Sequence, residues 1–432
     1  MDKLLGIRRE DKNIWEKRVP LIPEDVKELK EKFGIETVIQ PNDNRAFSDN
    51  EYLDVGAKVD PDIGRCSHII AVKEIPVNLI TPEKVYMFFS HTIKGQDYNM
   101  PLLQRILDLK STLIDYECIA DEKGRRLVFF GRYAGLAGMI ETFYGLGRRL
   151  KANGFVTPFL QIKQAFEYKD IDDAKTHIKE IAKEIESENM PVEISPMVFG
   201  FAGYGNVSKG AQEIFDLIPH VQISPDELLN LALDNSKIYK VIFEEKDLVE
   251  PKEDNTEFEL QDYYQNPGKY KSKFHQYLSK LNVLINGIFW NEDYPRLLTK
   301  EYLKKNFDKV KLEIVSDISC DINGSIEFTE KVTEPDNPAF IYNPETDKID
   351  DGFEGKGIIN IAVDNLPAEI PRDSSRSFSQ SLRPFINKIM KADYDLSFEE
   401  IDLPPEIKNA VIVYKGELTP KYQYLNEFLR NQ

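Results

Sequence analysis

Residues 196–215 read PMVFGFAGYGNVSKGAQEIF, and this stretch decides the fold of the chain around it. Its first half is short and apolar, as expected of a buried strand, and from Val207 onward apolar residues recur at helical spacing. Between the two halves stand Gly203 and Gly205, with Ser208 in the place of the third glycine of a G-x-G-x-x-G turn. A strand, glycine turn and helix in this order predict a dinucleotide site, although a tight structural turn is the alternative.

The length and composition limit the class of protein. A chain of 432 residues is too long for one hydrophobic core, so we expect two domains. The formal net charge of −18 argues against a nucleic-acid partner, because the phosphate backbone would be repelled. No apolar run approaches the roughly 18 residues that cross a membrane, and the charged start is not a signal peptide. These features predict a cytoplasmic protein with neither a nucleic-acid nor a membrane partner.

The cysteines are few and widely separated. Cys66, Cys118 and Cys320 are odd in number and show no metal-ligand spacing. They are interpreted as reduced, mostly buried thiols, and no metal site is expected.

Short apolar runs alternate with helical patterns in the first part of the chain, which predicts a parallel α/β sheet. The expected strands and helices are residues 3–8, a helix from Pro23, residues 36–40, a helix near Asp49–Val55, residues 68–73, residues 85–90, a helix around Met100–Leu109 and residues 111–117. The same alternation continues around the glycine turn, with strands expected at 220–224, 240–243, 282–290, 311–319 and 357–367.

The predicted fold is therefore α/β, with two Rossmann-like domains that have parallel sheets and an active-site cleft between them. Residues 1–137 plus 338–432 are expected to form the substrate domain, and residues 138–337 the dinucleotide-binding domain. A glycine-rich helix from Gly135 to about Leu150 is expected to permit close packing between the domains. Residues 244–268 are expected to form an acidic surface insertion, and the tail from Leu396 to pack on the first domain.

Cofactor preference is inferred from the strand HVQIS at 220–224, interpreted as the second strand of the nucleotide fold. An NAD site commonly carries an acidic residue at the end of this strand, where it binds the ribose 2′-hydroxyl. Ser224 stands there, and Asp226 follows two residues later. This pattern favours NADP(H), while NAD(H) stays open.

Ionisable residues follow three of the predicted strands in the first domain. Lys73 with Glu74, His91 and Glu117 each come at or just after such a strand end. Because the carboxyl ends of parallel strands line the ligand crevice, these residues together form a candidate site.

Several motifs carry a resemblance to a known family. They are RREDKNIWEKRVPLIP (8–23), AVKEIP (71–76), FFSHTIKGQ (88–96), LIDYE (113–117), FGRYAGLAGMI (130–140), GYGNVSKGAQ (203–212), INGIFW (285–290), DISCDINGSIEF (317–328) and VDNLPAEIP (363–371). With these motifs the chain resembles lysine–ketoglutarate reductase, also called saccharopine dehydrogenase (lysine-forming), the first half of bifunctional aminoadipic semialdehyde synthase. The wider superfamily contains alanine dehydrogenase and the first part of transhydrogenase. The similarity runs from about residue 4 to 425, and only one of the two activities of the fused enzyme is implied.

The resemblance implies a reductive condensation of lysine with 2-oxoglutarate to saccharopine, or its reverse, with a nicotinamide cofactor. Imine formation needs a neutral amine and a protonated leaving hydroxyl, and thus groups that titrate near neutrality. By resemblance Lys73 and His91 are the acid–base pair; holding neighbouring loops by hydrogen bonds is the alternative. Desolvation beside another cation would lower the pKa of Lys73.

The carboxylates of the substrates require cations. Arg18 fits one of them, with a surface ion pair to Glu16 as the alternative, and Arg132 fits a second, with a packing role as the alternative. By resemblance Glu74, Glu117 and Asp321 are acidic residues of the site, and Lys94 pairs with Asp321, which lies near the nicotinamide ribose. The remaining cofactor residues implied are Gly203, Tyr204, Gly205, Asn206, Val207, Ser208 and Asn286.

Two other functions stay open at this stage. An alanine dehydrogenase would share much of the pattern, although residues 244–280 and the tail exceed what that fold needs. A catalytically inactive binding or regulatory relative is the second alternative. The oligomeric state, including a homo-oligomer, and the metabolic direction are not determined by the sequence.

Overall fold

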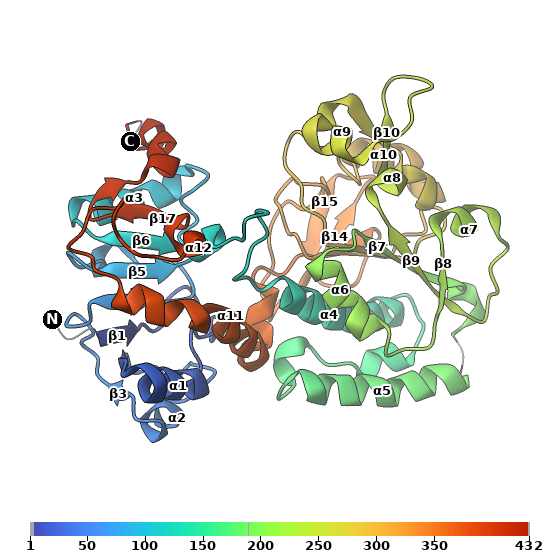
Figure 1. Ribbon diagram of the computed structural model, residues 1–432. Helices are drawn as coiled ribbons and strands as arrows, with labels where there is room; N and C mark the ends of the chain where they lie inside the picture. Colours follow the sequence, from blue (N-terminus) through green and yellow to red (C-terminus); the bar gives the residue numbers. More distant parts are fainter. Residues whose placement is uncertain (1–3, 189, 431–432) are drawn as a thin grey trace. The chain divides into compact units, whose positions relative to one another are not determined.

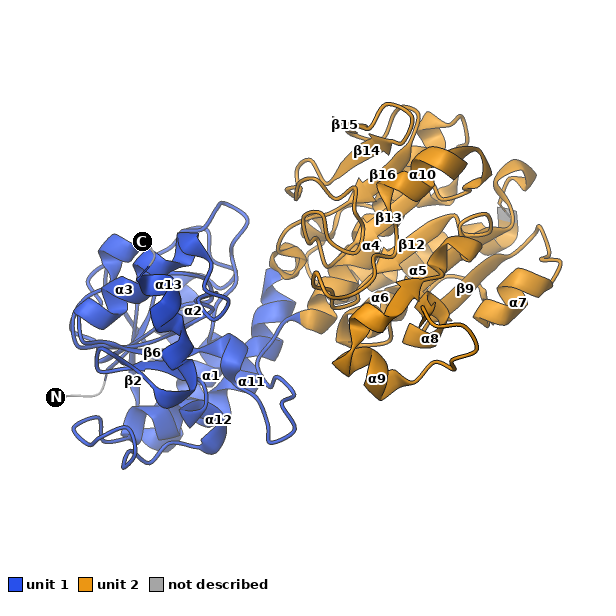
Figure 2. Ribbon diagram, turned by 90° about the horizontal axis from the view of Figure 1, so that it is seen from above, with its two compact units in different colours: residues 1–130, 371–432 blue, residues 131–370 orange. Residues whose placement is uncertain are grey.

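The computed structural model describes residues 4–188 and 190–430. The chain forms two compact units, residues 1–130 with 371–432, and residues 131–370 (Figure 2). These boundaries differ from the expected ones in two places: the first falls earlier than residue 137, and residues 338–370 belong to unit 2.

Unit 1 is built on an eight-stranded sheet with the order β18-β17-β6-β5-β4-β1-β2-β3. The six strands from the first part of the chain are parallel, as predicted, whereas β17 and β18 add antiparallel edge strands. The strands are β1 (Leu4–Ile7), β2 (Glu36–Ile39), β3 (Lys58–Val59), β4 (His68–Ile70), β5 (Val85–Phe88), β6 (Thr112–Asp115), β17 (Val411–Tyr414) and β18 (Glu417–Leu418).

Among the described residues of unit 1, six α-helices accompany this sheet, and the tail lies in unit 1 as expected because β17 pairs with β6. Pro23 stands at the first position of α1, where its missing N–H costs no hydrogen bond. The helices are α1 (Pro23–Phe33), α2 (Asp49–Asp54), α3 (Met100–Asp108), α11 (Pro371–Lys391), α12 (Pro405–Lys408) and α13 (Asn426–Leu429). A single apolar core joins the sheet to these helices.

Unit 2 contains a second eight-stranded sheet with the order β15-β14-β16-β13-β12-β7-β9-β8. Its strands are parallel except at one edge, where β14 pairs antiparallel with β16 and β15 pairs antiparallel with β14. The strands are β7 (Met197–Ala202), β8 (Val221–Ile223), β9 (Ile238–Phe243), β12 (Val283–Asn286), β13 (Ile314–Asp317), β14 (Ala339–Asn343), β15 (Lys348–Asp351) and β16 (Ile358–Ile361).

Helices cover both faces of this second sheet, with α4, α5 and α6 on one side (Figure 1). Each face therefore has its own core: Phe199 and Phe201 of β7 pack into one, and Val198 and Ala202 into the other. This pattern explains why β7 is apolar along its whole length. The helices are α4 (Gly131–Ala152), α5 (Ile171–Glu188), α6 (Asn206–Phe215), α7 (Pro225–Asn230), α8 (Glu245–Leu248), α9 (Leu260–Gln265) and α10 (Lys300–Asn306).

The acidic stretch 244–268 is more than a surface insertion. It forms α8, the strand β10 (Val249–Pro251) and α9, and β10 pairs with β11 (Tyr270–Ser272). Leu248, Val249 and Tyr263 are buried in the core of unit 2. Many of its other residues are exposed, Tyr264 among them, so the expectation was wrong for these buried residues only.

The glycines of α4 serve a purpose other than the one expected. A Cβ on Gly135 would lie 1.9 Å from the carbonyl oxygen of Val207, and one on Gly210 would lie 2.1 Å from that of Arg132. These two glycines therefore let α4 and α6 approach closely inside unit 2, and the expectation of packing between domains was wrong.

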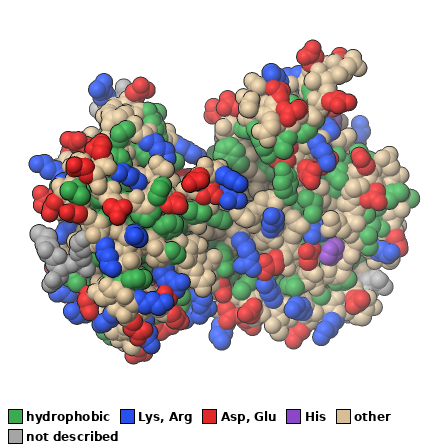
Figure 3. Space-filling view, in the orientation of Figure 1, with side chains coloured by type: hydrophobic (Ala, Val, Ile, Leu, Met, Phe, Trp, Pro, Cys, Tyr) green, Lys and Arg blue, Asp and Glu red, His purple; other side chains and the backbone are tan. Residues whose placement is uncertain are grey.

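The formal net charge of the chain is −18. Acidic and basic side chains intermingle on the face drawn in Figure 3. Cys66 is buried, Cys118 and Cys320 are partly exposed, and all three are free thiols. Within residues 4–188 and 190–430, no helix is long and apolar enough to cross a membrane.

Candidate active site

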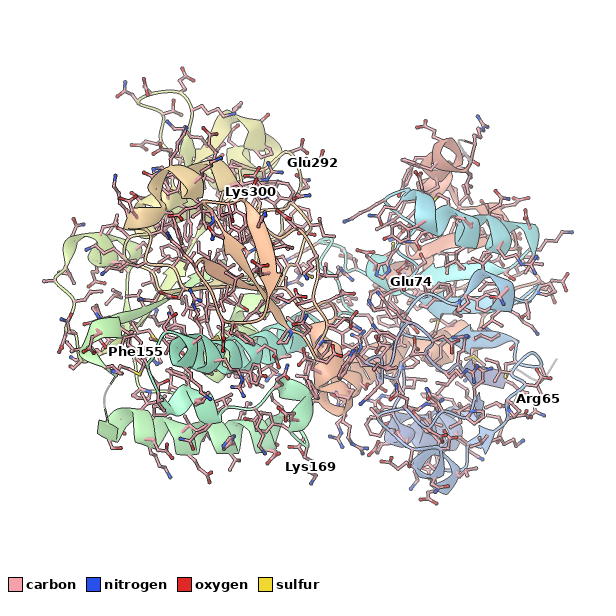
Figure 4. The ribbon with its side chains drawn as sticks, turned by 180° about the vertical axis from the view of Figure 1, so that it is seen from behind. Arg65, Glu74, Phe155, Lys169, Glu292 and Lys300 are labelled. Carbon is pink, nitrogen blue, oxygen red and sulfur yellow. The ribbon has the colours of Figure 1, made fainter. Side chains whose placement is uncertain are left out.

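Four neighbouring parallel strands of unit 1, β1, β4, β5 and β6, end at one edge of the sheet. The chain that follows β1 carries Arg18, that after β4 carries Lys73 and Glu74, that after β5 carries His91, and that after β6 carries Glu117. The predicted convergence on one sheet edge is therefore confirmed for the three strand ends that precede Lys73 with Glu74, His91 and Glu117. Glu74 is labelled in Figure 4, on unit 1.

His91 is held by its backbone and by a carboxylate. It lies three residues after the end of β5 and has a φ of 51°, a left-handed conformation that is uncommon outside glycine. Its ring Nδ1 is hydrogen-bonded to Glu74 Oε1, and the ring stacks on Phe89 with centroids 6.2 Å apart. Burial opposes ionisation of Glu74, but the hydrogen bond and charge of His91 outweigh it and lower the pKa of Glu74 to about 2. Glu74 therefore stays ionised and orients the His91 ring.

Lys73 has a lower pKa than an ordinary lysine. Burial lowers its pKa, and the charges of Arg18 and Lys12 lower it further, against the opposing charge of Glu16. These are the two causes, desolvation and a neighbouring cation, that the sequence suggested. Lys73 is thereby easier to deprotonate than an ordinary lysine.

Arg18 forms the ion pair with Glu16 that was its alternative role, but the pair is buried. The Arg18 side chain is 2% exposed and that of Glu16 is fully buried. Arg18 Nε donates to Glu16 Oε1 at 2.8 Å, Nη2 donates to Oε2 at 2.6 Å, and the guanidinium lies 4.2 Å over the Phe130 ring. The expected surface ion pair is thus corrected to a buried, two-bond one that fixes the guanidinium plane.

Two carboxylates that the sequence reasoning missed tie this edge together. Glu10 accepts the backbone N–H groups of Val72 at 2.7 Å and Lys73 at 3.0 Å, and burial and the charge of Glu16 raise its pKa to about 7. Asp115, the last residue of β6, accepts the backbone N–H of Ser90 at 3.0 Å and that of Glu117 at 2.7 Å. Glu10 therefore holds the backbone at Lys73. Asp115 holds the backbone at Ser90, beside His91, and at Glu117.

The other predicted substrate residues are less tightly grouped. Glu117 lies 3.7 Å from Arg126, and Lys94 is exposed. Arg132 is in unit 2, where its guanidinium pairs with Glu213 through Nε at 2.9 Å and Nη2 at 2.7 Å. The pairing of Lys94 with Asp321 joins residues of different units and stays a prediction.

The glycine turn in unit 2 has the geometry that a dinucleotide requires. Gly203 has a φ of 87°, and a Cβ on Gly205 would meet no atom within 4 Å, so open space adjoins it. Asn206, Val207 and Ser208 then open α6, whose first N–H groups lack acceptors within the helix. The residues present therefore fit a pyrophosphate at this helix start.

Tyr204 stands between the two glycines with its side chain partly exposed. The motif INGIFW packs beside the turn, since a Cβ on Gly287 would lie 2.9 Å from Val207 Cγ1.

Asn286 and Asp317 close the neighbouring strand ends. Asn286 Nδ2 donates to Asp317 Oδ1 and to Ser325 Oγ, both at 2.8 Å, while Asn286 Oδ1 is buried without a partner among the described residues. Burial raises the pKa of Asp317 to about 6. Asp321, by contrast, is exposed and lies just after the Cys320 residue of positive φ.

The strand order corrects the argument for cofactor preference. β9, not β8, is the parallel neighbour of β7, and β8 pairs only with β9. Ser224, which follows β8, is therefore not at the end of the strand next to the glycine turn. It caps α7 instead, by accepting the N–H of Glu227 at 3.2 Å.

Comparisons with known proteins agree with this architecture. Residues 6–137 match the N-terminal domain of the alanine dehydrogenase/PNT family, and residues 246–421 its C-terminal domain. Among solved structures, L-alanine dehydrogenase has a TM-score of 0.64 at 17% identity over 99% of both chains. The transhydrogenase of Sinorhizobium meliloti has a TM-score of 0.58 at 16% identity, over 96% of this chain and 100% of that one.

Curated relatives are closer in sequence. The α-aminoadipic semialdehyde synthase of Arabidopsis thaliana is 38% identical over 98% of this chain and 41% of its own length. The synthase of Mus musculus is 36% identical over 98% of this chain and 48% of its own. The saccharopine dehydrogenase [NAD(+), L-lysine-forming] of Schizosaccharomyces pombe is 26% identical over 90% of this chain and 94% of its own. The chain thus spans less than half the length of the two synthases.

Proposed function

Because the chain belongs to the alanine dehydrogenase/PNT family, we propose that it is an oxidoreductase that joins L-lysine and 2-oxoglutarate reductively to form saccharopine, or runs the reverse reaction. A nicotinamide cofactor supplies or accepts the hydride when it is bound. The observation that carries the proposal is the pair formed by a lysine of lowered pKa, Lys73, and a carboxylate-held histidine, His91, at adjacent strand ends.

The chemistry suits these residues. The ε-amine of lysine attacks the ketone only when neutral, so a group must remove a proton from the ammonium; Lys73 has the lowered pKa that this needs. The carbinolamine then loses its hydroxyl as water, and His91, oriented by Glu74, donates the proton. Arg18, and in unit 2 Arg132, are the proposed partners of the substrate carboxylates. Glu117 and Lys94 complete the proposed substrate set.

The glycine turn supports the cofactor role of unit 2. Gly203, Gly205 and the start of α6 are proposed to bind the pyrophosphate, with Tyr204, Asn286 and Asp321 as further cofactor residues. The length match to the S. pombe saccharopine dehydrogenase and the identity to the synthases both support the lysine reaction over a different amino acid.

The test is a substrate comparison with the purified protein. We expect oxidation of the reduced cofactor with lysine plus 2-oxoglutarate, and none with either alone. Pyruvate plus ammonia is the second arm, because the fold is that of L-alanine dehydrogenase. Equal rates in the two arms would reject the lysine reaction and favour the alanine one.

A further inference from the structure

The strand beside the glycine turn ends in two carboxylates. β9 pairs with β7 in parallel register from Met197 opposite Ile238 to Ala202 opposite Phe243. The backbone N–H of Gly203 then donates to the carbonyl oxygen of Phe243 at 3.0 Å. The chain therefore leaves β9 directly beside the glycine turn, and its next two residues are Glu244 and Glu245.

Glu245 faces the turn itself. Its Oε1 accepts a hydrogen bond from the hydroxyl of Tyr264 at 2.6 Å and lies 3.5 Å from the hydroxyl of Tyr204. Tyr204 is the middle residue of the Gly203–Gly205 turn, whereas Tyr264 comes from α9. Figure 1 shows α8, β10 and α9 together at one end of the unit. The side chain of Glu245 is half-buried, and its contacts with the hydroxyls of Tyr264 and Tyr204 hold its position.

A second carboxylate precedes Glu245. Glu244 is exposed, its backbone N–H donates to Asp247 Oδ2 at 2.9 Å, and its side chain lies 3.0 Å from Lys246. Glu244 and Glu245 are thus two adjacent carboxylates at the end of β9, and a phosphate group placed against them would be repelled.

We propose that Glu245 accepts the 2′-hydroxyl of the adenosine ribose and, with Glu244, excludes a 2′-phosphate, so that the enzyme uses NAD(H) in preference to NADP(H). The proposal rests on the proposed function for the presence of a dinucleotide, and it deepens that function by assigning the cofactor. A carboxylate at the end of the strand next to the turn strand is the arrangement that binds an unphosphorylated ribose, whereas an arginine there accommodates the phosphate.

The test measures binding without substrates, so that it is independent of the reaction catalysed. NADH and NADPH are titrated separately into the full-length protein, and Kd is obtained from the nicotinamide fluorescence. We expect NADH to bind at least tenfold more tightly than NADPH. Equal Kd values, tighter NADPH binding, or no binding of either nucleotide would overturn the proposal.

Two variants of Glu245 and one control variant test whether Glu245 sets the cofactor preference. Glu245→Gln keeps the shape and removes the charge, and we expect the NADPH-to-NADH Kd ratio to fall about tenfold. Glu245→Arg should reverse the preference. Glu250→Gln, in β10, changes the same residue type in a partly exposed side chain that pairs with Lys271 at 3.3 Å, and should leave both Kd values unchanged. An unchanged ratio in both Glu245 variants, with melting curves like that of the native protein, would also overturn the proposal.

The reaction assay separates the two hypotheses. Tighter NADH binding in a protein that does not turn over lysine and 2-oxoglutarate rejects the proposed function and keeps the cofactor assignment. Turnover that proceeds faster with NADPH keeps the proposed function and rejects the assignment.

Discussion

The carboxylate of Glu10 accepts the backbone N–H of Lys73 at 3.0 Å, and it accepts that of Val72 at 2.7 Å. A side chain from the loop after β1 thus fixes the main chain that carries the proposed base after β4. This contact makes Glu10 a positioning residue for Lys73, since it reaches the lysine through its backbone.

The first prediction tests the contact of the Glu10 carboxylate with the backbone N–H groups of Val72 and Lys73. Glu10→Gln keeps the size of the side chain but offers one acceptor oxygen in place of two, so one backbone N–H loses its partner. We expect kcat to fall about tenfold while the Kd for the cofactor, measured by titration, stays constant. Arg9→Gln is the control, because Arg9 is the exposed neighbour. If kcat is unchanged in Glu10→Gln, the loop does not depend on this carboxylate.

The second prediction concerns Lys73 and His91. Replacing either by Met should lower kcat by about 10²–10⁴-fold, the usual contribution of a general acid or base, with little effect on cofactor binding. The double variant should lose less than the product of the two single losses, because both groups serve the same proton transfers. Near-normal turnover in the double variant would place the chemistry elsewhere.

The third prediction follows from the buried pair of Arg18 and Glu16. Arg18→Lys keeps the charge but loses the two-bond geometry, so one side-chain hydrogen bond to the buried carboxylate of Glu16 is lost, at a cost of about 1–3 kcal/mol of stability. We expect a lower melting temperature and a KM for 2-oxoglutarate that rises more than kcat falls. Lys17→Arg is the matched control. A variant with native stability and native KM would show that the two-bond geometry of the Arg18 guanidinium is not needed.

Much of unit 1 could be predicted because its strands are short, apolar and followed by polar residues. The expected strands 68–73, 85–90 and 111–117 contain β4, β5 and β6, and each was expected to end two or three residues later than it does. Glu10 and Asp115 were missed because Glu10 binds the backbone N–H groups of Val72 and Lys73 and Asp115 binds that of Ser90, long-range contacts that no local pattern reveals. The apolar strand ending in Asp115 was the available signal, since a carboxylate that finishes a buried strand must find donors.

The neighbour of β7 was misassigned for a physical reason. Sequence order places HVQIS directly after α6, but strand pairing is long-range and can skip an element. β8 is three residues long and none of them is fully buried, as suits an edge strand, whereas five of the six residues of β9 are buried. The longer apolar run was therefore the sign of the inner strand.

The fourth prediction uses the titration of Asp115, which is 0% exposed. Burial raises its pKa to about 6, above that of an unfolded aspartate, so the folded state holds the proton more tightly. The contribution of Asp115 to stability is therefore largest below about pH 4, declines as the pH rises to about 6 and is constant above, a change of at most about 3 kcal/mol.

The measurement is the difference in unfolding free energy between the native protein and Asp115→Asn, followed from pH 4 to pH 8. We expect this difference to fall with rising pH through the window named, since the asparagine does not titrate. A free-energy difference that does not change with pH, or that grows as the pH rises, would contradict the expected direction.

The fifth prediction concerns the contact of α4 with α6. A Cβ on Gly135 would lie 1.9 Å from the carbonyl oxygen of Val207 and 2.6 Å from the backbone N of Ala211, so α6 itself would have to move. Gly135→Ala gains up to about 1 kcal/mol of helix propensity, but overpacking costs about 1–3 kcal/mol or more, and backbone atoms yield less than side chains. We expect net destabilisation in a urea titration, together with weaker binding of NADH, because α6 begins at the glycine turn. Gly268→Ala is the matched control, since its Cβ would meet no atom within 4 Å. If Gly135→Ala matched Gly268→Ala in both stability and NADH affinity, the contact between α4 and α6 would tolerate a Cβ at residue 135, which would contradict this prediction.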